Sequence, residues 1–89
     1  MTVVALMWEA RAAAGRGAEL LEWARAQVLD RRPLRRETFR AAEDRVLVVT
    51  WWEAPDVHAE LPELPEPAAD AVTRPVHRWR FESAGLDTV

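Results

Sequence analysis

The stretch "VLVVTWWEAPDVH", residues 46–58, decides how this chain folds. Its valines and tryptophans favour a β-strand, and Pro55 ends the run. Successive side chains of a strand point to opposite faces, so Trp51 and Trp52 lie on different faces of the sheet. Both faces are therefore apolar at this strand, and each of them needs a cover.

The other strands are predicted by the same kind of pattern. The apolar run at residues 2–9, "TVVALMWE", is typical of a strand buried on both faces. Residues 34–41 are more polar, as in a strand at a sheet edge, and a tight connection joins them to the strand at residues 45–53. Residues 74–83 alternate apolar and charged side chains, which predicts a strand with one apolar and one charged face.

Two segments have helical character. Residues 18–29 carry apolar side chains at helical spacing with charged ones on the other side, which predicts a helix. The second helical region is expected to be broken. Asp56 suits the N-cap of a helix over "VHAEL", but three prolines follow, and a second piece is expected to begin near Pro67 and run through "AADAV". We interpret the proline-rich "LPELPEP" as a stiff loop that replaces helix; a partner ligand or an active-site lid are the alternatives.

The order strand, helix, strand, strand, broken helix, strand is that of a ferredoxin-like α+β fold with a βαββαβ antiparallel sheet, in one domain spanning residues 1–89. In that topology the first and third strands lie in the middle of the sheet. The hydropathy pattern agrees, because the first and third strands are the two most apolar runs.

Pairing the strands by their midpoints assigns each side chain to a face. The face that we expect the helices to cover is rich in aromatic residues: Val4, Leu6, Trp8, Phe39, Leu47, Val49, Trp51, His77, Trp79 and Phe81. The other face carries Val3, Ala5, Met7, Val46, Val48, Thr50, Trp52 and Val76, with Arg78 and Arg80 toward one edge. An uncovered apolar patch of roughly several hundred Å² is unusual for a monomer. The sequence therefore predicts a homodimer, with Trp52 in or beside the interface.

The composition excludes several classes of protein. The 89 residues include no cysteine, which rules out disulfides and thiolate chemistry. The formal net charge of -3 argues against nucleic-acid binding. All 12 basic residues are arginine, and Lys, Asn, Ile and Tyr are absent, which indicates a GC-rich bacterial gene. No run is long enough to cross a membrane and no signal peptide is evident, so we expect a cytoplasmic protein.

Two longer stretches carry a family resemblance: "VVALMWEARAAAGRGAELLEWAR" and "VVTWWEAPDVHAEL". In these stretches the chain resembles the dimeric α+β barrel superfamily, and within it the antibiotic biosynthesis monooxygenase-like proteins. The resemblance implies a homodimer with a ligand cavity between sheet and helices. It also implies oxidation of flat phenols or quinols by dioxygen without metal or flavin. The cavity would be lined by Trp8, Trp51, His77 and Trp79, with His58 arriving from the broken helix.

The two histidines are the side chains whose ordinary pKa suits proton transfer near neutrality. His77 or His58 could take a phenolic proton and leave an anion that reacts with dioxygen. For both residues a structural role is the competing and preferred interpretation. Trp8, Trp51, Trp79 and Phe39 could stack on a flat aromatic ligand, and core packing is the alternative for this set.

The two histidines and the scattered carboxylates form no metal motif, so neither a metal nor another cofactor is expected. Two hypotheses of function remain. The first is a small cofactor-independent monooxygenase-like protein that binds a flat aromatic or polyketide-like substrate. The second is a non-catalytic homodimeric ligand-binding or auxiliary protein of the same fold.

Overall fold

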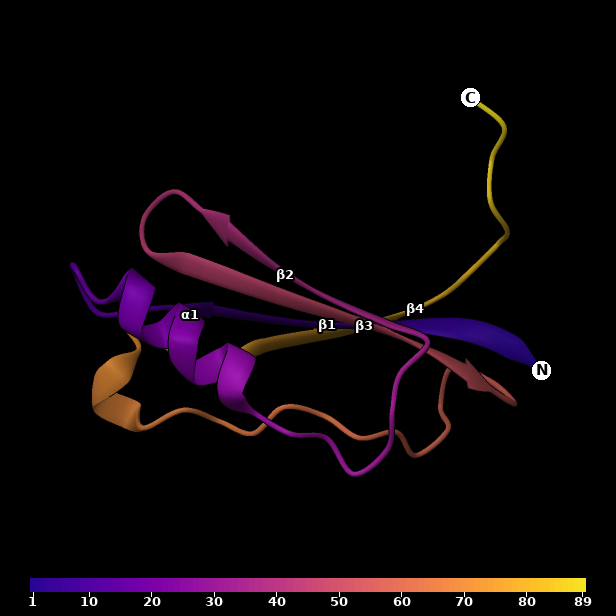
Figure 1. Ribbon diagram of the computed structural model, residues 1–89, viewed down its shortest axis with the longest axis horizontal. Coiled ribbons are helices and arrows are strands. Elements are labelled where there is room, and N and C mark those ends of the chain that lie inside the picture. Colours follow the sequence, from indigo (N-terminus) through magenta and orange to yellow (C-terminus); the bar gives the residue numbers. More distant parts are fainter.

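The computed structural model describes residues 1–89 and has an α+β fold (Figure 1). The elements in chain order are β1 (Thr2–Arg11), α1 (Gly17–Ala26), β2 (Arg35–Ala41), β3 (Arg45–Ala54), a short 3₁₀ helix η1 (Ala69–Ala71) and β4 (His77–Glu82). The predicted helix and all four predicted strands are thus present, with small shifts at their ends.

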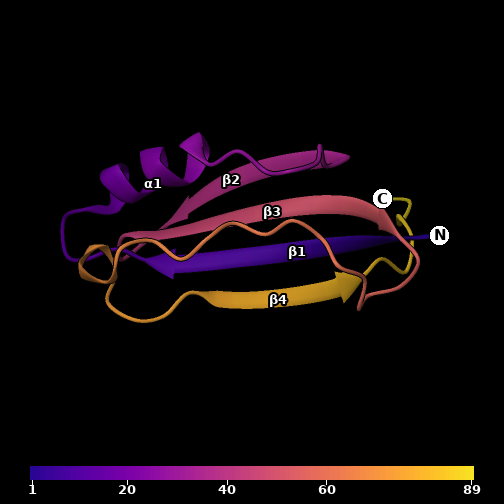
Figure 2. The same ribbon diagram turned by 90° about the horizontal axis from the view of Figure 1, so that it is seen from below.

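The four strands form one open antiparallel sheet in the order β2-β3-β1-β4 (Figure 2). The prediction that the first and third strands lie in the middle is confirmed. Both edges of each of these two strands are hydrogen-bonded to a neighbouring strand, and one of their faces is covered by other parts of the chain. The charged strands β2 and β4 lie at the edges.

One face of the sheet is covered by α1 and by residues 55–68, which we call the strap (Figure 2). The strap runs back across the sheet without regular secondary structure. The predicted helix over "VHAEL" is therefore wrong: Asp56 forms a turn instead, in which its carboxylate accepts the His58 backbone N–H at 2.8 Å. The predicted helix after Pro67 is reduced to η1. The interpretation of "LPELPEP" as a loop in place of helix is confirmed, and its prolines are the reason, since they lack the N–H that a helix interior needs.

The predicted register of β1 against its neighbours was wrong by one residue. Val4, Leu6 and Trp8 lie on the covered face as predicted, but the residues of the other three strands that were grouped with them lie on the opposite face: Phe39, Leu47, Val49, Trp51, His77, Trp79 and Phe81. Val4 pairs with Trp52 and Trp8 with Val48, so Trp8 shares a face with Trp52 and not with Trp51. Strand β1 continues through Ala10 and Arg11, which moves its midpoint by one residue relative to the predicted strand. A shift of one residue exchanges the faces of every side chain in a strand.

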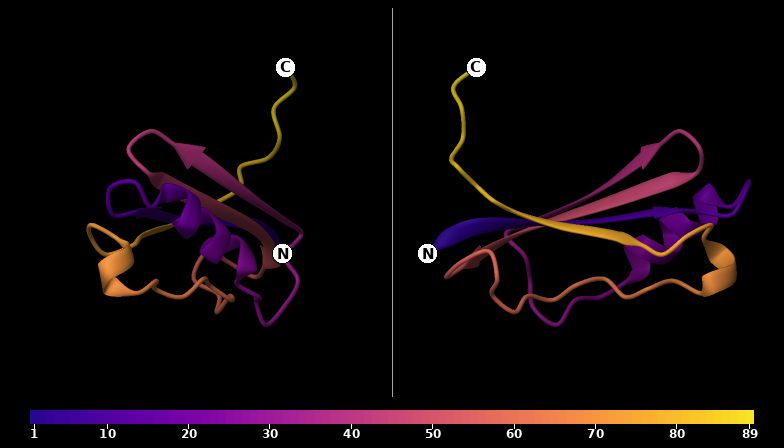
Figure 3. Two further views of the ribbon diagram at one scale, coloured as in Figure 1. Left: turned by 60° about the vertical axis from the view of Figure 1, so that its left-hand side comes forward. Right: turned by 180° about the vertical axis from the view of Figure 1, so that it is seen from behind.

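Two expectations change with this register. Trp52 is almost fully buried beneath the chain's own covering segments, whereas Trp51 lies on the face that they leave open. The prediction that Trp51 faces the helices and Trp52 lies at an interface was therefore wrong. The C-terminal residues leave the end of β4 on the side of the sheet opposite to the strap (Figure 3).

The core lies between the sheet and its cover. Its larger cluster joins both central strands to α1 and the strap, and consists of Trp8, Ala10, Ala12, Leu20, Ala24, Val46, Val48, Leu64 and Val76. A smaller cluster of Val4, Leu6, Trp52 and Ala54 lies under the half-buried apolar side chains at the start of the strap. The alanines at the larger cluster allow the short helix to approach the sheet closely.

Candidate functional site

The face of the sheet that carries no cover is the most distinctive surface of the molecule. We call it the open face. The strand register arranges its side chains in three rows across β2, β3, β1 and β4: Arg35, Trp51, Ala5 and Phe81; Glu37, Val49, Met7 and Trp79; Phe39, Leu47, Glu9 and His77.

The middle of the open face is apolar, and its aromatic residues are exposed. Phe39, Trp79 and Phe81 are 38%, 44% and 53% exposed. The four strands lie about 4.8 Å apart and the three rows lie about 6.7 Å apart, so the grid covers an area on the order of 400 Å². The apolar side chains occupy part of this area, and a contiguous exposed apolar patch on a soluble protein often marks an interaction surface.

The charged side chains of the open face are already paired with one another. At the β2 edge Arg35 forms an ion pair with Glu37, and its guanidinium lies 5.1 Å from the centroid of the Trp51 ring. A cation over an aromatic face in this way is stabilised by the ring quadrupole. The pair therefore brings no net charge to the β2 edge.

A second polar cluster lies at the β4 edge. The Glu9 carboxylate, only 13% exposed, accepts a hydrogen bond from Arg74 Nη2 at 2.6 Å, and His77 Nδ1 lies 3.8 Å from the same oxygen. The His77 ring in turn contacts Trp79 edge to face, with ring centroids 5.5 Å apart. Arg74 thus neutralises the carboxylate that the central strand β1 carries on this face.

The residues predicted as a site are divided between the two faces of the sheet. His77, Trp51, Trp79 and Phe39 share the open face. Trp8 lies on the covered face, where its indole N–H donates to the Pro65 carbonyl at 3.2 Å. His58 lies in the strap, whose neighbouring Val57 and Ala59 carbonyls accept from Arg80 on the covered side. His77 lies on the open face, so the sheet separates the two histidines and they do not share one site.

The covered face leaves almost no space between the sheet and the strap. The hollow under the strap, beside Trp8, Val48 and Leu64, has a volume of about 10 Å³. Leu64 and the Trp8 indole fill the region where the resemblance implies a ligand cavity. A water molecule alone needs about that much volume.

A larger hollow lies at the amino end of α1 and was not anticipated from the sequence. It has a volume of about 150 Å³ and lies between α1 and residues 67–71, with Trp23 and Leu20 in its wall. Trp23 stacks on Trp8, with centroids 6.0 Å apart. Nothing in the sequence indicated which segment would lie opposite Trp23.

The rim of this hollow carries a paired arginine and carboxylate. Arg16 donates to both oxygens of Glu19 at 2.9 and 3.0 Å, and also to the Asp70 carbonyl at 3.0 Å. The hydrogen bond from Arg16 lowers the pKa of the Glu19 carboxyl below its ordinary value, and the same bond raises the pKa of the Arg16 guanidinium. This pair ties the start of α1 to η1.

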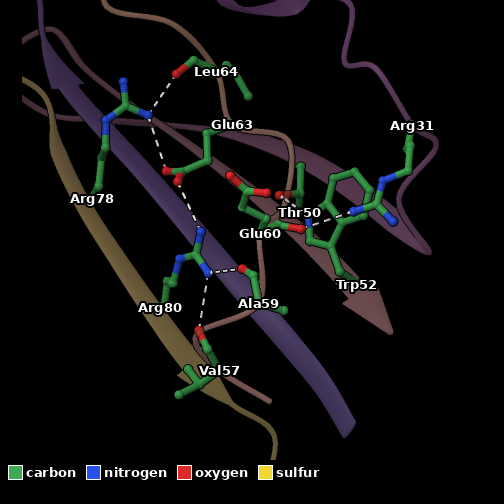
Figure 4. A network of polar contacts seen from close by, with 10 residues as sticks. All are labelled: Arg31, Thr50, Trp52, Val57, Ala59, Glu60, Glu63, Leu64, Arg78 and Arg80. Carbon is green, nitrogen blue, oxygen red and sulfur yellow. Dashed lines mark hydrogen bonds and ion pairs between the residues drawn. The ribbon is translucent and has the colours of Figure 1, made fainter. Parts of the chain in front are cut away.

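The strap is held down by arginines that the strand pattern had placed only at a sheet edge (Figure 4). Arg80 donates to the Val57 and Ala59 carbonyls at 3.2 and 2.6 Å, and Arg78 donates to the Leu64 carbonyl at 2.7 Å. Glu63 lies between the two guanidinium groups, 3.1 and 3.4 Å from them. The strap carbonyls therefore obtain from side chains the donors that a helix would have supplied from its own backbone.

No three His, Asp or Glu side chains lie close enough together to hold a metal ion. The single α-helix is also too short and too polar to cross a membrane. Comparison of the chain with family models, with curated proteins and with solved structures gave no match in any of the three. Any assignment of function therefore depends on the geometry described above.

Proposed function

We propose that this protein is a non-catalytic homodimeric module with a ferredoxin-like topology, in which the open faces of two copies pack against each other as in a dimeric α+β barrel. The observation that carries the proposal is the open face itself, which no segment of the chain covers and on which Phe39, Trp79 and Phe81 are exposed. Packed sheets lie about 10 Å apart, so apolar side chains of this size would fill the space between two such faces.

The charges on the open face favour a second copy of the chain as its partner. Buried charges are costly unless they are paired, and both polar clusters are already neutralised within one chain by Arg35 and Arg74. They lie at opposite edges of the sheet, so the apolar middle can meet itself under two-fold symmetry. A charged partner would find little to pair with on this surface.

The dimer is tested by sedimentation equilibrium of the wild-type protein and of Phe81→Glu. We expect the wild type to be a dimer at micromolar concentration. A charge at Phe81 would be buried without a partner, and should raise the dissociation constant by about tenfold or more. Val28→Glu is the matched control, because Val28 is 92% exposed and lies after α1 on the covered side. A wild-type monomer, or equal weakening by both substitutions, would contradict the proposal.

The second candidate is the cofactor-free oxidation of a flat aromatic compound that the resemblance implies. The hollow of about 150 Å³ beside Trp23 favours it, since a single planar ring could stack there on Trp23. Oxygen uptake with anthrone or quinol substrates tests this activity, and a ligand that binds only the native state must raise the melting temperature. Activity that survives His77→Ala, His58→Ala and Trp51→Phe would exclude the residues predicted from the sequence.

A further inference from the structure

The hollow between α1 and residues 67–71 has the size and the walls of a site for one aromatic ring. Its volume is about 150 Å³, and its apolar walls come from Leu20, Trp23, Pro67, Ala68 and Ala71. An apolar cavity of about 150 Å³ can hold one benzene molecule. The Trp23 ring already lies against Trp8, with ring centroids 6.0 Å apart, so this wall is in place before a ligand enters.

The rim of the hollow carries three charged side chains, and their charges do not cancel. Arg16 and Glu19 neutralise each other through two hydrogen bonds, and the third guanidinium nitrogen of Arg16 donates to the Asp70 carbonyl. The Asp70 carboxylate has neither an ion pair nor a hydrogen bond within the chain, so one unpaired negative charge remains at the rim. A hollow with such a rim favours a cation over an anion such as a phenolate.

From these observations we infer that the hollow binds a small aromatic amine, with its ring against Trp23 and its ammonium group at the Asp70 carboxylate. A cation near a tryptophan ring is also stabilised by the ring quadrupole. The inference goes beyond the proposed homodimer and does not depend on it, because α1 packs on the covered side of the sheet (Figure 1). A second copy on the open face would leave the hollow accessible.

Two probes of equal size separate the contribution of the charge from that of the ring. Phenethylamine is an ammonium ion near neutral pH, whereas phenethyl alcohol is neutral. Each is titrated into the isotope-labelled full chain, and binding is followed by NMR chemical shifts. We expect the amine to bind with a dissociation constant in the millimolar range or below. It should bind about three- to fivefold more tightly than the alcohol, which is the gain expected from an ion pair at an exposed rim.

Substitutions at the rim and in the wall locate the site. Asp70→Asn should reduce the affinity for the amine to that for the alcohol. Asp30→Asn is the matched control, because Asp30 lies in the exposed loop after α1, and it should leave both affinities unchanged. Ala68→Leu should fill the hollow and abolish binding of both probes. Ala68 is exposed, so this variant should still fold.

The largest chemical-shift changes should occur at the Trp23 indole N–H and at the Ala71 amide. Any of four results would overturn the inference: no binding of the amine, equal affinity of the wild type for both probes, an amine affinity that Asp70→Asn does not reduce, or binding that persists in Ala68→Leu. Sedimentation measures the homodimer separately. A failure of amine binding would therefore leave the proposed dimer intact, and a wild-type monomer that binds the amine would overturn the dimer alone.

Discussion

Replacing Arg80 by alanine should release the strap from the sheet. The Arg80 side chain is 29% exposed, and its guanidinium joins two strap carbonyls and the Glu63 carboxylate. A hydrogen bond with a charged donor contributes about 1.5–3 kcal/mol. The freed carbonyls could turn partly to water once the strap loosens, so we expect a net loss of about 2 kcal/mol for the group rather than the sum of its bonds.

For a domain of this size a loss of about 2 kcal/mol corresponds to a decrease in Tm of roughly 8–16 °C. The assay is thermal unfolding followed by circular dichroism, with all variants at one protein concentration because dimerisation would also affect Tm. Tryptophan fluorescence gives a local measurement, since Trp8 and Trp52 are buried under the strap and its neighbours and should shift to longer wavelength as water enters.

Arg32→Ala is the matched control, because Arg32 is exposed and makes no ion pair or side-chain hydrogen bond. Arg80→Lys should recover part of the loss, since one ammonium group cannot reproduce the planar donor set of a guanidinium. If Arg80→Ala lowers Tm no more than Arg32→Ala does, the strap is held by its apolar contacts alone, and the conclusion that Arg80 holds it to the sheet is wrong.

Three further predictions concern single residues away from the strap. Arg36→Met should destabilise the protein by about 1–2 kcal/mol in urea unfolding, because Arg36 donates to the Ala24 and Gln27 carbonyls at the carboxyl end of α1, both at 2.7 Å. Glu43→Asn should stabilise it by about 0.5–1 kcal/mol in the same assay, since Glu43 occupies the left-handed region at φ 65° in the turn between β2 and β3, where asparagine is favoured. The lowered pKa of Glu19 means that its contribution is present above the unfolded-state pKa and is lost as the pH falls through the folded-state pKa. Glu19→Gln should therefore reduce the acid-range loss of stability measured by thermal unfolding at a series of pH values, and high salt should have a similar effect.

The strands were predictable because their information is local. The β-branched and aromatic residues of "RVLVVTWWE" and the apolar run before Glu9 favour strands, and residues 74–83 alternate with a period of two. None of these patterns depends on the rest of the chain. The strand order also followed, since only the two most apolar runs could lie in the centre of the sheet. The turn between β2 and β3 was predicted as short, but its two left-handed residues, Glu43 and Asp44, are not the usual Asn-Gly signal.

The candidate site was only partly predictable, for a different reason. The sequence identified the aromatic residues Trp51, Trp79 and Phe39 as one group, and the register places them together on the open face. It assigned Trp8 to the same group, which was wrong because Ala10 and Arg11 lengthen β1. The hydrogen bonds from Arg78 and Arg80 to the strap were not predicted either. An alternating strand with charges on one face is expected to present those charges to water.

By itself, the sequence determined the elements, the antiparallel α+β class and the excess of apolar sheet surface, all of which depend on local periodicity and on the two central runs. The tertiary structure alone decided which face is covered, because the register of β1 against β3 joins residues far apart in the chain and changes the face of every side chain with a shift of one residue. It also decided that a proline-containing strap, held by arginines from β4, takes the place of a second helix. Trp52 is therefore core and Trp51 is surface, although they are neighbours in the sequence.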